Sequence, residues 1–273
     1  MDYDDEQEYY WESPQEERLP DLVEQQAIAA LRTFFEANKD QVFASRQVEI
    51  FFEDKYFHWI THRAIKKLAE EKSIILEQRT LSYGASINFV WHRLNRYTTR
   101  QTSEVMALVE QYSHPDFTAA LGNTGELLVS DGLSRFGFAQ RGRNTNSFNG
   151  KKWVKTDHNL DFVFERDERL YGVEVKNTLS YITDTELDAK LELSAHLDLS
   201  PVFVVRQMPR IWIQRIAKAG GFTLVLKYQL YPLSHKALAE KVRSVMKLPV
   251  DAPKALYDGT IQRFLNWHER NLG

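Results

Sequence analysis

The chain has 273 residues, 43% of them hydrophobic, which is enough for one large domain or two ordinary ones. It contains no cysteine, which excludes disulfide bonds and thiolate-zinc sites and fits a reducing compartment, so we expect a cytoplasmic protein. No apolar run is long enough to span a bilayer, and the start of the sequence is too acidic for a signal peptide.

The net charge of −3 conceals a strong asymmetry along the chain. Residues 1–24 contain ten acidic residues and one basic residue, so they carry −9 and leave +6 for the rest of the sequence. A basic remainder is typical of a protein that binds a polyanion. The acidic segment is expected to be disordered up to about Pro20. It is either a solubilising tail or a mimic of nucleic acid that folds back on the basic surface.

Residues 21–97 are predicted to form three helices followed by a β-hairpin. Apolar residues recur at helical spacing in the helices, and two strand-like segments flank a turn that contains Gly84. The expected elements are helices over 22–38, from Ser45 onward and over 58–72, then strands over 73–78 and 87–93. This order resembles the winged helix-turn-helix family.

The winged-helix resemblance implies that the third helix enters the major groove of DNA. Its outward residues would then contact the nucleic acid: His62, Arg63, Lys66 and Lys67. Two alternatives stay open. Glu70 and Glu71 lie at the C-terminal end of the same helix and balance its basic residues. The charges could form an ordinary solvated face, and many winged helices serve as protein-protein or dimer modules.

A polar, basic stretch over 93–100 predicts a domain boundary. Residues 98–273 would form the second domain, with a linker helix at its start and helices at its C-terminal end. A helix over 123–138 is expected to carry Glu126 in its first turn and to pack through residues that include Leu127.

The stretch 140–159 is predicted to be a flexible loop with a one-sided charge. Its basic residues would neutralise phosphates and contact the substrate: Arg141, Arg143, Lys151, Lys152 and Lys155.

Residues 161–176 are predicted to form a β-hairpin with charged residues at its open end. Two apolar, alternating segments flank a turn between Arg166 and Arg169. A two- or four-residue turn centred there would place Asp161 directly opposite Glu174, with Cβ atoms about 5 Å apart. The strands are otherwise apolar on both sides, which indicates a buried, central hairpin.

Two carboxylates and one ammonium group would therefore converge on this hairpin. Lys176 follows Glu174 by two positions and so points to the same face as Asp161 and Glu174. Neighbouring like charges in a sheet core are costly unless something binds them, and a divalent cation would do so. The alternative is a structural cluster, in which Lys176 forms salt bridges with the two acids.

Asp161 and the sequence Glu174-Val175-Lys176 resemble the PD-(D/E)xK nuclease superfamily, which has the restriction-endonuclease-like fold. That family has an acid at a strand end, then Asp/Glu-x-Lys in the next strand, and a further acid on an earlier helix, here Glu126. Leu160 stands at the position of the proline in the family's name. The resemblance covers roughly residues 105–230.

Helices and strands alternate after the hairpin. The predicted elements are helices over 183–196 and 209–219, strands over 201–206 and 222–226, and two final helices over 235–247 and 260–271. This alternation predicts an α/β fold with a mixed central sheet flanked by helices. Lys190 and Gln214 are conceivable additional active-site groups on these later helices.

The resemblance implies a Mg²⁺- or Mn²⁺-dependent endonuclease that hydrolyses phosphodiester bonds. Asp161, Glu174, the main-chain carbonyl of Val175 and Glu126 would hold the metal ion, because hard cations prefer oxygen ligands. Lys176 would orient or deprotonate the attacking water and stabilise the transition state. The winged helix makes DNA the preferred substrate, with RNA as the alternative. A homodimer would supply the two active sites that cutting both strands of a duplex requires.

A different interpretation is a DNA-binding regulator in which the nuclease-like fold is only a scaffold. The joint presence of Asp161, Glu174 and Lys176 argues against it, since an inactive site need not keep all three.

Overall fold

The computed structural model describes residues 21–272, so the acidic segment predicted to be disordered up to Pro20 lies outside the described residues. The chain divides into two compact units, Met1–His114 and Pro115–Gly273. The helix predicted as a linker at the start of the second domain therefore falls in the first unit. Within the described part of the chain, no helix is long and apolar enough to cross a membrane.

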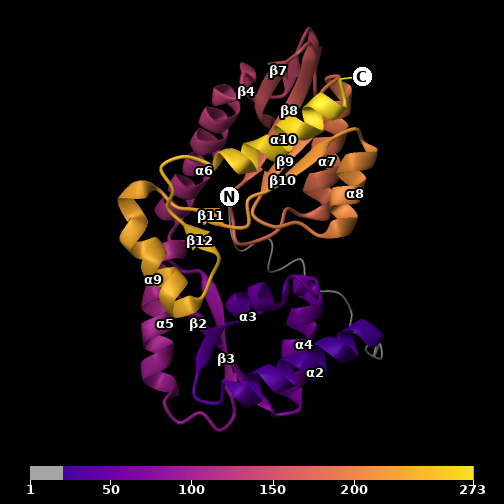
Figure 1. The fold of residues 1–273 in the computed structure, drawn as a ribbon. Helices are drawn as coiled ribbons and strands as arrows, with labels where there is room; N and C mark the ends of the chain where they lie inside the picture. The colour runs from indigo at the N-terminus through magenta and orange to yellow at the C-terminus, as the bar shows by residue number, and fades with distance from the viewer. Residues whose placement is uncertain (1–20, 273) are drawn as a thin grey trace. The chain divides into compact units, whose positions relative to one another are not determined.

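The first unit combines helices with a small antiparallel sheet (Figure 1). Its elements are α2 (Leu22–Ala37), β1 (Val42–Ala44), α3 (Ser45–Phe52), α4 (His58–Glu70), β2 (Ile74–Thr80), β3 (Ser86–His92) and α5 (Thr98–Ser113). The strand order is β1-β3-β2. The predicted helices and hairpin are confirmed, and β1 is an addition. A strand of three residues is too short to show the alternation by which strands are recognised in a sequence.

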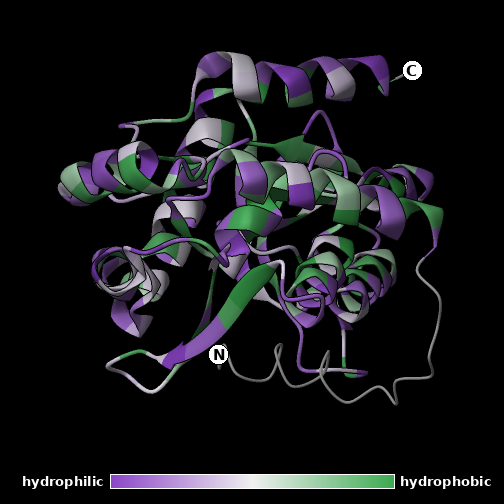
Figure 2. Cartoon of the chain, turned by 90° about the horizontal axis from the view of Figure 1, so that it is seen from below, coloured by the Kyte–Doolittle hydropathy of each residue, from purple (hydrophilic) through white to green (hydrophobic). Residues whose placement is uncertain are grey.

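One apolar core holds the first unit together. The side chain of Asp21 caps α2 by accepting a hydrogen bond from the N–H of Glu24 at 2.8 Å. The helices of this unit bury one face each. Figure 2 shows hydrophobic (green) and hydrophilic (purple) residues alternating along the helices of the chain. The buried residues include Ala27, Leu31, Phe35, Val48, Ala64, Leu68 and Val90.

The second unit is built on a mixed five-stranded sheet in the order β10-β9-β8-β7-β4. Strands β4, β7 and β8 are antiparallel neighbours, whereas β8, β9 and β10 are parallel. The strands of this sheet are β4 (Ala139–Thr145), β7 (Leu160–Arg166), β8 (Arg169–Lys176), β9 (Ser200–Val205) and β10 (Phe222–Val225). Two short pairs lie outside it: β5 (Ser147–Phe148) with β6 (Lys151–Lys152), and β11 (Gln229–Leu230) with β12 (Val250–Asp251).

Helices cover both faces of the five-stranded sheet (Figure 1). The helices are α6 (Pro115–Arg135), α7 (Asp184–His196), α8 (Arg210–Lys218), the short η1 (Leu233–His235), α9 (Lys236–Met246) and α10 (Asp258–Arg270). Residues of α6 and α10 share one core with the sheet, and residues of α7 and α8 pack on the opposite face. The predicted mixed sheet flanked by helices is therefore confirmed.

The central hairpin has the predicted register. Phe162 pairs with Val173, so the predicted pair of Asp161 and Glu174 continues the same register directly beyond the end of the ladder. The two turn residues, Asp167 and Glu168, have φ of 50° and 60°. Positive φ at both central positions is the tight turn that matches the twist of a hairpin.

Half of the basic segment predicted to be a flexible loop, residues 140–159, instead forms strands. Residues 139–145 form β4, which pairs with β7 at the edge of the sheet, and β5 and β6 follow as a small hairpin. Most side chains of β4 are exposed, as is common for an edge strand that carries charges. A mostly polar strand has no apolar alternation, and this is why the sequence pattern indicated a loop.

The helix that carries Glu126 also differs from the prediction. It begins at Pro115 rather than near residue 123, so Glu126 lies in its middle and not in its first turn. Leu127, predicted to pack, has 62% of its surface exposed. Glycines within the helix weaken its sequence signal, because glycine is a poor helix former.

A buried hydrogen-bonded chain ties the C-terminal helix to the central hairpin. The Tyr171 hydroxyl lies 2.6 Å from Nδ1 of His268, and Nε2 of His268 lies 2.9 Å from Oδ2 of Asp167 in the turn. Tyr171 and His268 are fully buried. Buried polar atoms need such partners, so this chain fixes α10 against the hairpin.

We expect Tyr171→Phe to lower the free energy of unfolding by about 1–3 kcal/mol, because it leaves Nδ1 of His268 buried without its partner. Urea denaturation followed by tryptophan fluorescence would measure the change. Tyr228→Phe is the control, since Tyr228 is partly exposed. Equal losses in the two variants would contradict a stabilising role for the buried chain.

Candidate active site

The five-stranded sheet opens between its two central antiparallel strands. The β7–β8 ladder ends at the pair of Phe162 and Val173, while β7 stays paired with β4 and β8 with β9 beyond that point. We call residues 159–161 and 174–176 the open end of the hairpin. The residues predicted as Asp and Glu-x-Lys all lie there.

Asp161 occupies the space between the separating strands. Its Oδ2 accepts a hydrogen bond from the main-chain N–H of Val175 at 2.7 Å. Because the N–H and C=O of one residue leave the same side of a strand, the Val175 carbonyl also faces β7. Burial raises the pKa of Asp161, and the Glu126 carboxylate raises it further. The hydrogen bond from Val175 acts in the opposite direction and lowers it.

Glu174 is buried and held by a lysine that the sequence indicated only as a conceivable addition to the site. Its Oε2 accepts a hydrogen bond from Lys190 of α7 at 2.6 Å. Burial and the nearby Asp161 carboxylate raise the pKa of Glu174 to about 7, against the opposing effect of Lys190. Lys190 interrupts the apolar face of α7 between Leu187 and Leu193, and this was the signal available in the sequence.

Lys176 lies between two carboxylates. Its Nζ is 2.6 Å from Oε1 of Glu186 and 3.5 Å from Oε1 of Glu174. Burial alone would lower the pKa of Lys176, but the two carboxylates outweigh burial and raise it. The lysine is therefore a fixed positive charge in this arrangement.

A close contact of α6 with the end of β8 holds the residue that follows Lys176. The side chain of Asn177 donates to the carbonyl oxygens of Leu121 and Leu230, at 2.7 Å each, and accepts from the N–H of Leu230 at 2.6 Å. A Cβ at Gly125 would lie only 2.6 Å from Cβ of Asn177. Glycine at this position allows the helix to approach the strand, and Asn177 then fixes the position of Lys176.

Glu126 approaches the open end from α6 and is paired with Arg143 of β4. Their atoms Oε2 and Nη2 are 3.2 Å apart, and the Arg143 guanidinium lies over the Phe162 ring at 5.8 Å. Arg143 pairs in the sheet with Phe162, the residue after Asp161, and the Glu126 carboxylate helps to raise the pKa of Asp161. Glu126 is thus near the predicted site, with Arg143 as its present partner.

The oxygen atoms at the open end suit a hard cation, although residues 21–272 contain no group of three or more acidic or histidine side chains that could hold a metal. Asp161 and Glu174 are only a pair of carboxylates, and the third oxygen would come from the Val175 main chain. Burial raises the pKa values of both acids, and repulsion by a neighbouring carboxylate raises each further: Glu126 acts on Asp161, and Asp161 acts on Glu174. A bound cation would relieve this repulsion.

The basic residues predicted to contact DNA near the sheet lie on β4 and around the β5–β6 hairpin. Most of these residues form exposed ion pairs with acidic side chains. Such a pair contributes about 0–1 kcal/mol to stability, so a phosphate could replace the acidic partner. Among the described residues, Lys152 has no acidic partner. The others form the pairs Arg141–Glu165, Arg143–Glu126, Lys151–Asp198 and Lys155–Glu192.

The charged residues of α4 predicted to contact DNA also have acidic neighbours. Arg63 is 3.1 Å from Glu24, and Lys67 is 3.4 Å from Glu70. His62 lies 3.1 Å from Glu49, which is buried. Burial lowers the pKa of Lys66. These contacts fit the solvated-face alternative as well as a DNA contact.

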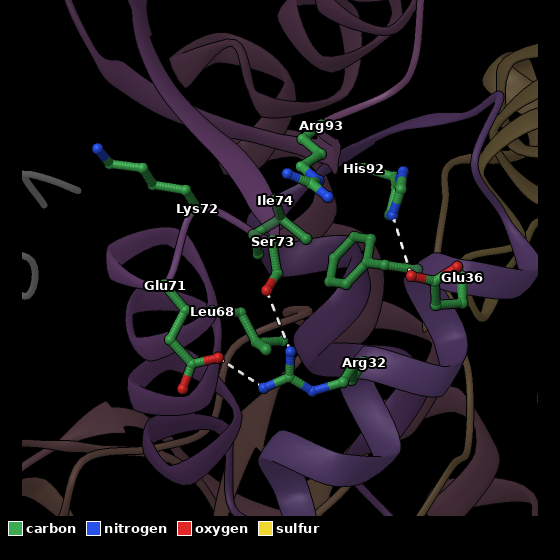
Figure 3. A pocket seen from close by; sticks show the side chains of 10 residues that line it. Arg32, Glu36, Leu68, Glu71, Lys72, Ser73, Ile74, His92 and Arg93 are labelled. Carbon is green, nitrogen blue, oxygen red and sulfur yellow. Dashed lines mark hydrogen bonds and ion pairs between the residues drawn. The ribbon is translucent and has the colours of Figure 1, made fainter.

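A pocket of about 270 Å³ in the first unit contains none of the predicted site residues. Figure 3 shows Arg32 bonded to Glu71 and Ser73, and His92 bonded to Glu36, within the pocket wall. Most of its charges are therefore satisfied internally, and the pocket gives no indication of a ligand.

Comparison with known proteins identifies no relative of this chain. No family profile, no curated protein and no solved structure matches it.

The buried carboxylate of Glu174 predicts a pH-dependent stability. Its folded-state pKa of about 7 lies above the ordinary 4.5, so its contribution to stability is complete below about pH 4.5 and is lost as the pH rises through 7. Glu174→Gln cannot ionise, and we expect its stability relative to wild type to rise by on the order of 3 kcal/mol between pH 5 and 8. Urea denaturation in EDTA would measure it. A constant difference across this range would contradict the raised pKa.

Proposed function

We propose that the second unit is a metal-dependent phosphodiester hydrolase of the PD-(D/E)xK type, with a restriction-endonuclease-like fold, and that it cuts DNA. The observation that carries this proposal is the open end of the hairpin. There Asp161, Glu174 and Lys176 come together between two strands that separate, and α7 covers the same face.

The order of elements around the site supports the proposal. The helix with Glu126 comes first, the basic strand β4 second, the hairpin with the other three residues third, and α7, β9, α8 and β10 follow. This is the order that the family resemblance implies. A chance Glu-x-Lys sequence would not need a partner acid opposite it, nor a glutamate from a preceding helix nearby.

The residues of the site have complementary roles in the proposed reaction. Asp161, Glu174 and the Val175 carbonyl would hold Mg²⁺ or Mn²⁺, with Glu126 as a further ligand. Such an ion lowers the pKa of a bound water and offsets phosphate charge. Lys176, whose pKa is raised, stays protonated near neutral pH. It therefore suits orienting the water and stabilising the phosphorane-like transition state better than removing a proton.

We further propose that the first unit is a winged helix that delivers the DNA. Its order of helices and strands, with β1 at the edge beside β3, supports this, and α4 would be the helix in the major groove. Arg141, Arg143, Lys151, Lys152 and Lys155 would contact phosphates near the scissile bond. A homodimer would bring a second site to the opposite strand of a duplex.

Nicking of supercoiled plasmid with Mg²⁺ or Mn²⁺ tests the nuclease. We expect metal-dependent nicking by the wild type and a loss of at least about 100-fold in Lys176→Ala, because the positive charge acts on the reacting phosphate. The rate of conversion to open-circular DNA is the measurement. Lys218→Ala, at the exposed end of α8, is the control and should keep wild-type activity.

Three other outcomes separate the alternatives. Equal activity in wild type and Lys176→Ala would place the active site elsewhere. Binding of duplex DNA without cleavage of any substrate would favour the regulator with a nuclease-like scaffold. Cleavage of RNA alone would make the substrate RNA.

The salt dependence of DNA affinity tests the winged helix. Removing one basic residue that binds a phosphate reduces the slope of log affinity against log salt concentration by about 0.9. We therefore expect the slope of the full-length double variant Arg63→Ala/Lys67→Ala to fall by about two in fluorescence anisotropy with a labelled duplex. The control is Lys39→Ala/Arg100→Ala, which removes two other exposed, paired bases of the same unit. Equal slopes in the two double variants would exclude α4 from the phosphate contacts.

A further inference from the structure

Lys190 connects the two strands that separate at the open end of the hairpin. Its Nζ donates to Oε2 of Glu174, which belongs to β8, at 2.6 Å. It also donates to the main-chain oxygen of Asn159, the residue directly before β7. One ammonium group therefore links the ends of the two separating strands and occupies one oxygen of Glu174.

The position of Lys190 is fixed by its helix. The Thr183 side chain caps α7 by accepting from the N–H of Glu186 at 3.1 Å, and Leu187 and Leu193 are buried on either side of Lys190. Only 4% of Lys190 is exposed. A lysine this deeply buried needs an anion beside it, and Glu174 is that anion.

The charge balance of the site leaves room for one added divalent cation. Around the open end, the ionised side chains of Asp161, Glu174, Glu186 and Glu126 carry four negative charges, while Lys176, Lys190 and Arg143 carry three positive charges, for a net −1. One divalent ion would bring this group to +1, and a second would bring it to +3. A buried site does not hold an excess of three like charges without compensation.

The oxygen atoms of Glu174 lead to the same conclusion. Oε2 is already bonded to Lys190 at 2.6 Å. Oε1 is 3.5 Å from Lys176, which is held more closely by Glu186 at 2.6 Å. Glu174 therefore presents one weakly engaged oxygen to an incoming ion.

We propose that Lys190 takes the place of a second divalent cation, so that this site binds a single metal ion. The inference rests on the proposed function. It assigns to Lys190 a positioning role, in which the ammonium group holds Glu174 by one oxygen and supplies the charge that another ion would otherwise supply.

Mn²⁺ binding without substrate tests this role. Titration of the full-length protein, with free Mn²⁺ followed by its EPR signal, should give one ion per wild-type chain. Lys190→Met keeps a side chain of similar length without the charge, so Oε2 is freed and the net charge falls to −2. We expect this variant to bind two Mn²⁺ per chain. Lys236→Met removes a lysine that pairs with Glu240 on the surface, and it should bind one.

The outcomes distinguish the inference from the function it rests on. Two Mn²⁺ bound by the wild type, together with metal-dependent nicking, would overturn the role of Lys190 and leave the nuclease intact. One ion in folded Lys190→Met would also overturn it. If that variant does not fold, Lys190→Gln provides the same comparison. One Mn²⁺ per wild-type chain would in any case exclude a site for two ions. No bound Mn²⁺ and no cleavage by the wild type would overturn the nuclease proposal as well.

Discussion

The hydrogen bond from the Val175 N–H to the Asp161 carboxylate is the interaction on which the site depends. A sheet that opens between two central strands exposes main-chain groups that would otherwise pair, and buried groups of this kind must find partners. Asp161 satisfies one of them with its side chain. The strand separation and the acidic residue therefore belong together, because without the carboxylate the open end would leave a buried donor unpaired.

The two acids at this opening are costly to ionise because they are buried, and a lysine of α7 offsets part of this cost. Burial raises the pKa of both Asp161 and Glu174, and the Asp161 carboxylate raises that of Glu174 further. Lys190 and Lys176 offset that cost from the covering helix and from the strand itself. Buried ion pairs of this type seldom add stability compared with apolar residues, so their presence in the middle of a sheet favours a chemical role over a purely structural one.

The hairpin could be predicted from the sequence because its register follows from a turn of defined length. The turn at Asp167 and Glu168 fixes which residues face each other, and the register agrees with the prediction. The remainder of the site depends on contacts between distant segments. Lys190 reaches Glu174 from a helix across the sheet, and neither helical periodicity nor spacing along the chain shows which strand such a helix will cover. The basic strand β4 escaped recognition for a different reason, since its edge position removes the apolar alternation.

The fixed charges around Lys176 bear on how the proposed reaction would proceed. A lysine acts as a base only when its pKa falls toward neutrality, which requires burial without nearby anions. Here Glu174 and Glu186 have the opposite effect and keep the ammonium protonated. The proton of an attacking water would then have to leave by a route other than Lys176. The arrangement thus favours a mechanism in which the protein supplies position and charge, and in which activity depends more on the metal and the substrate than on a protein base.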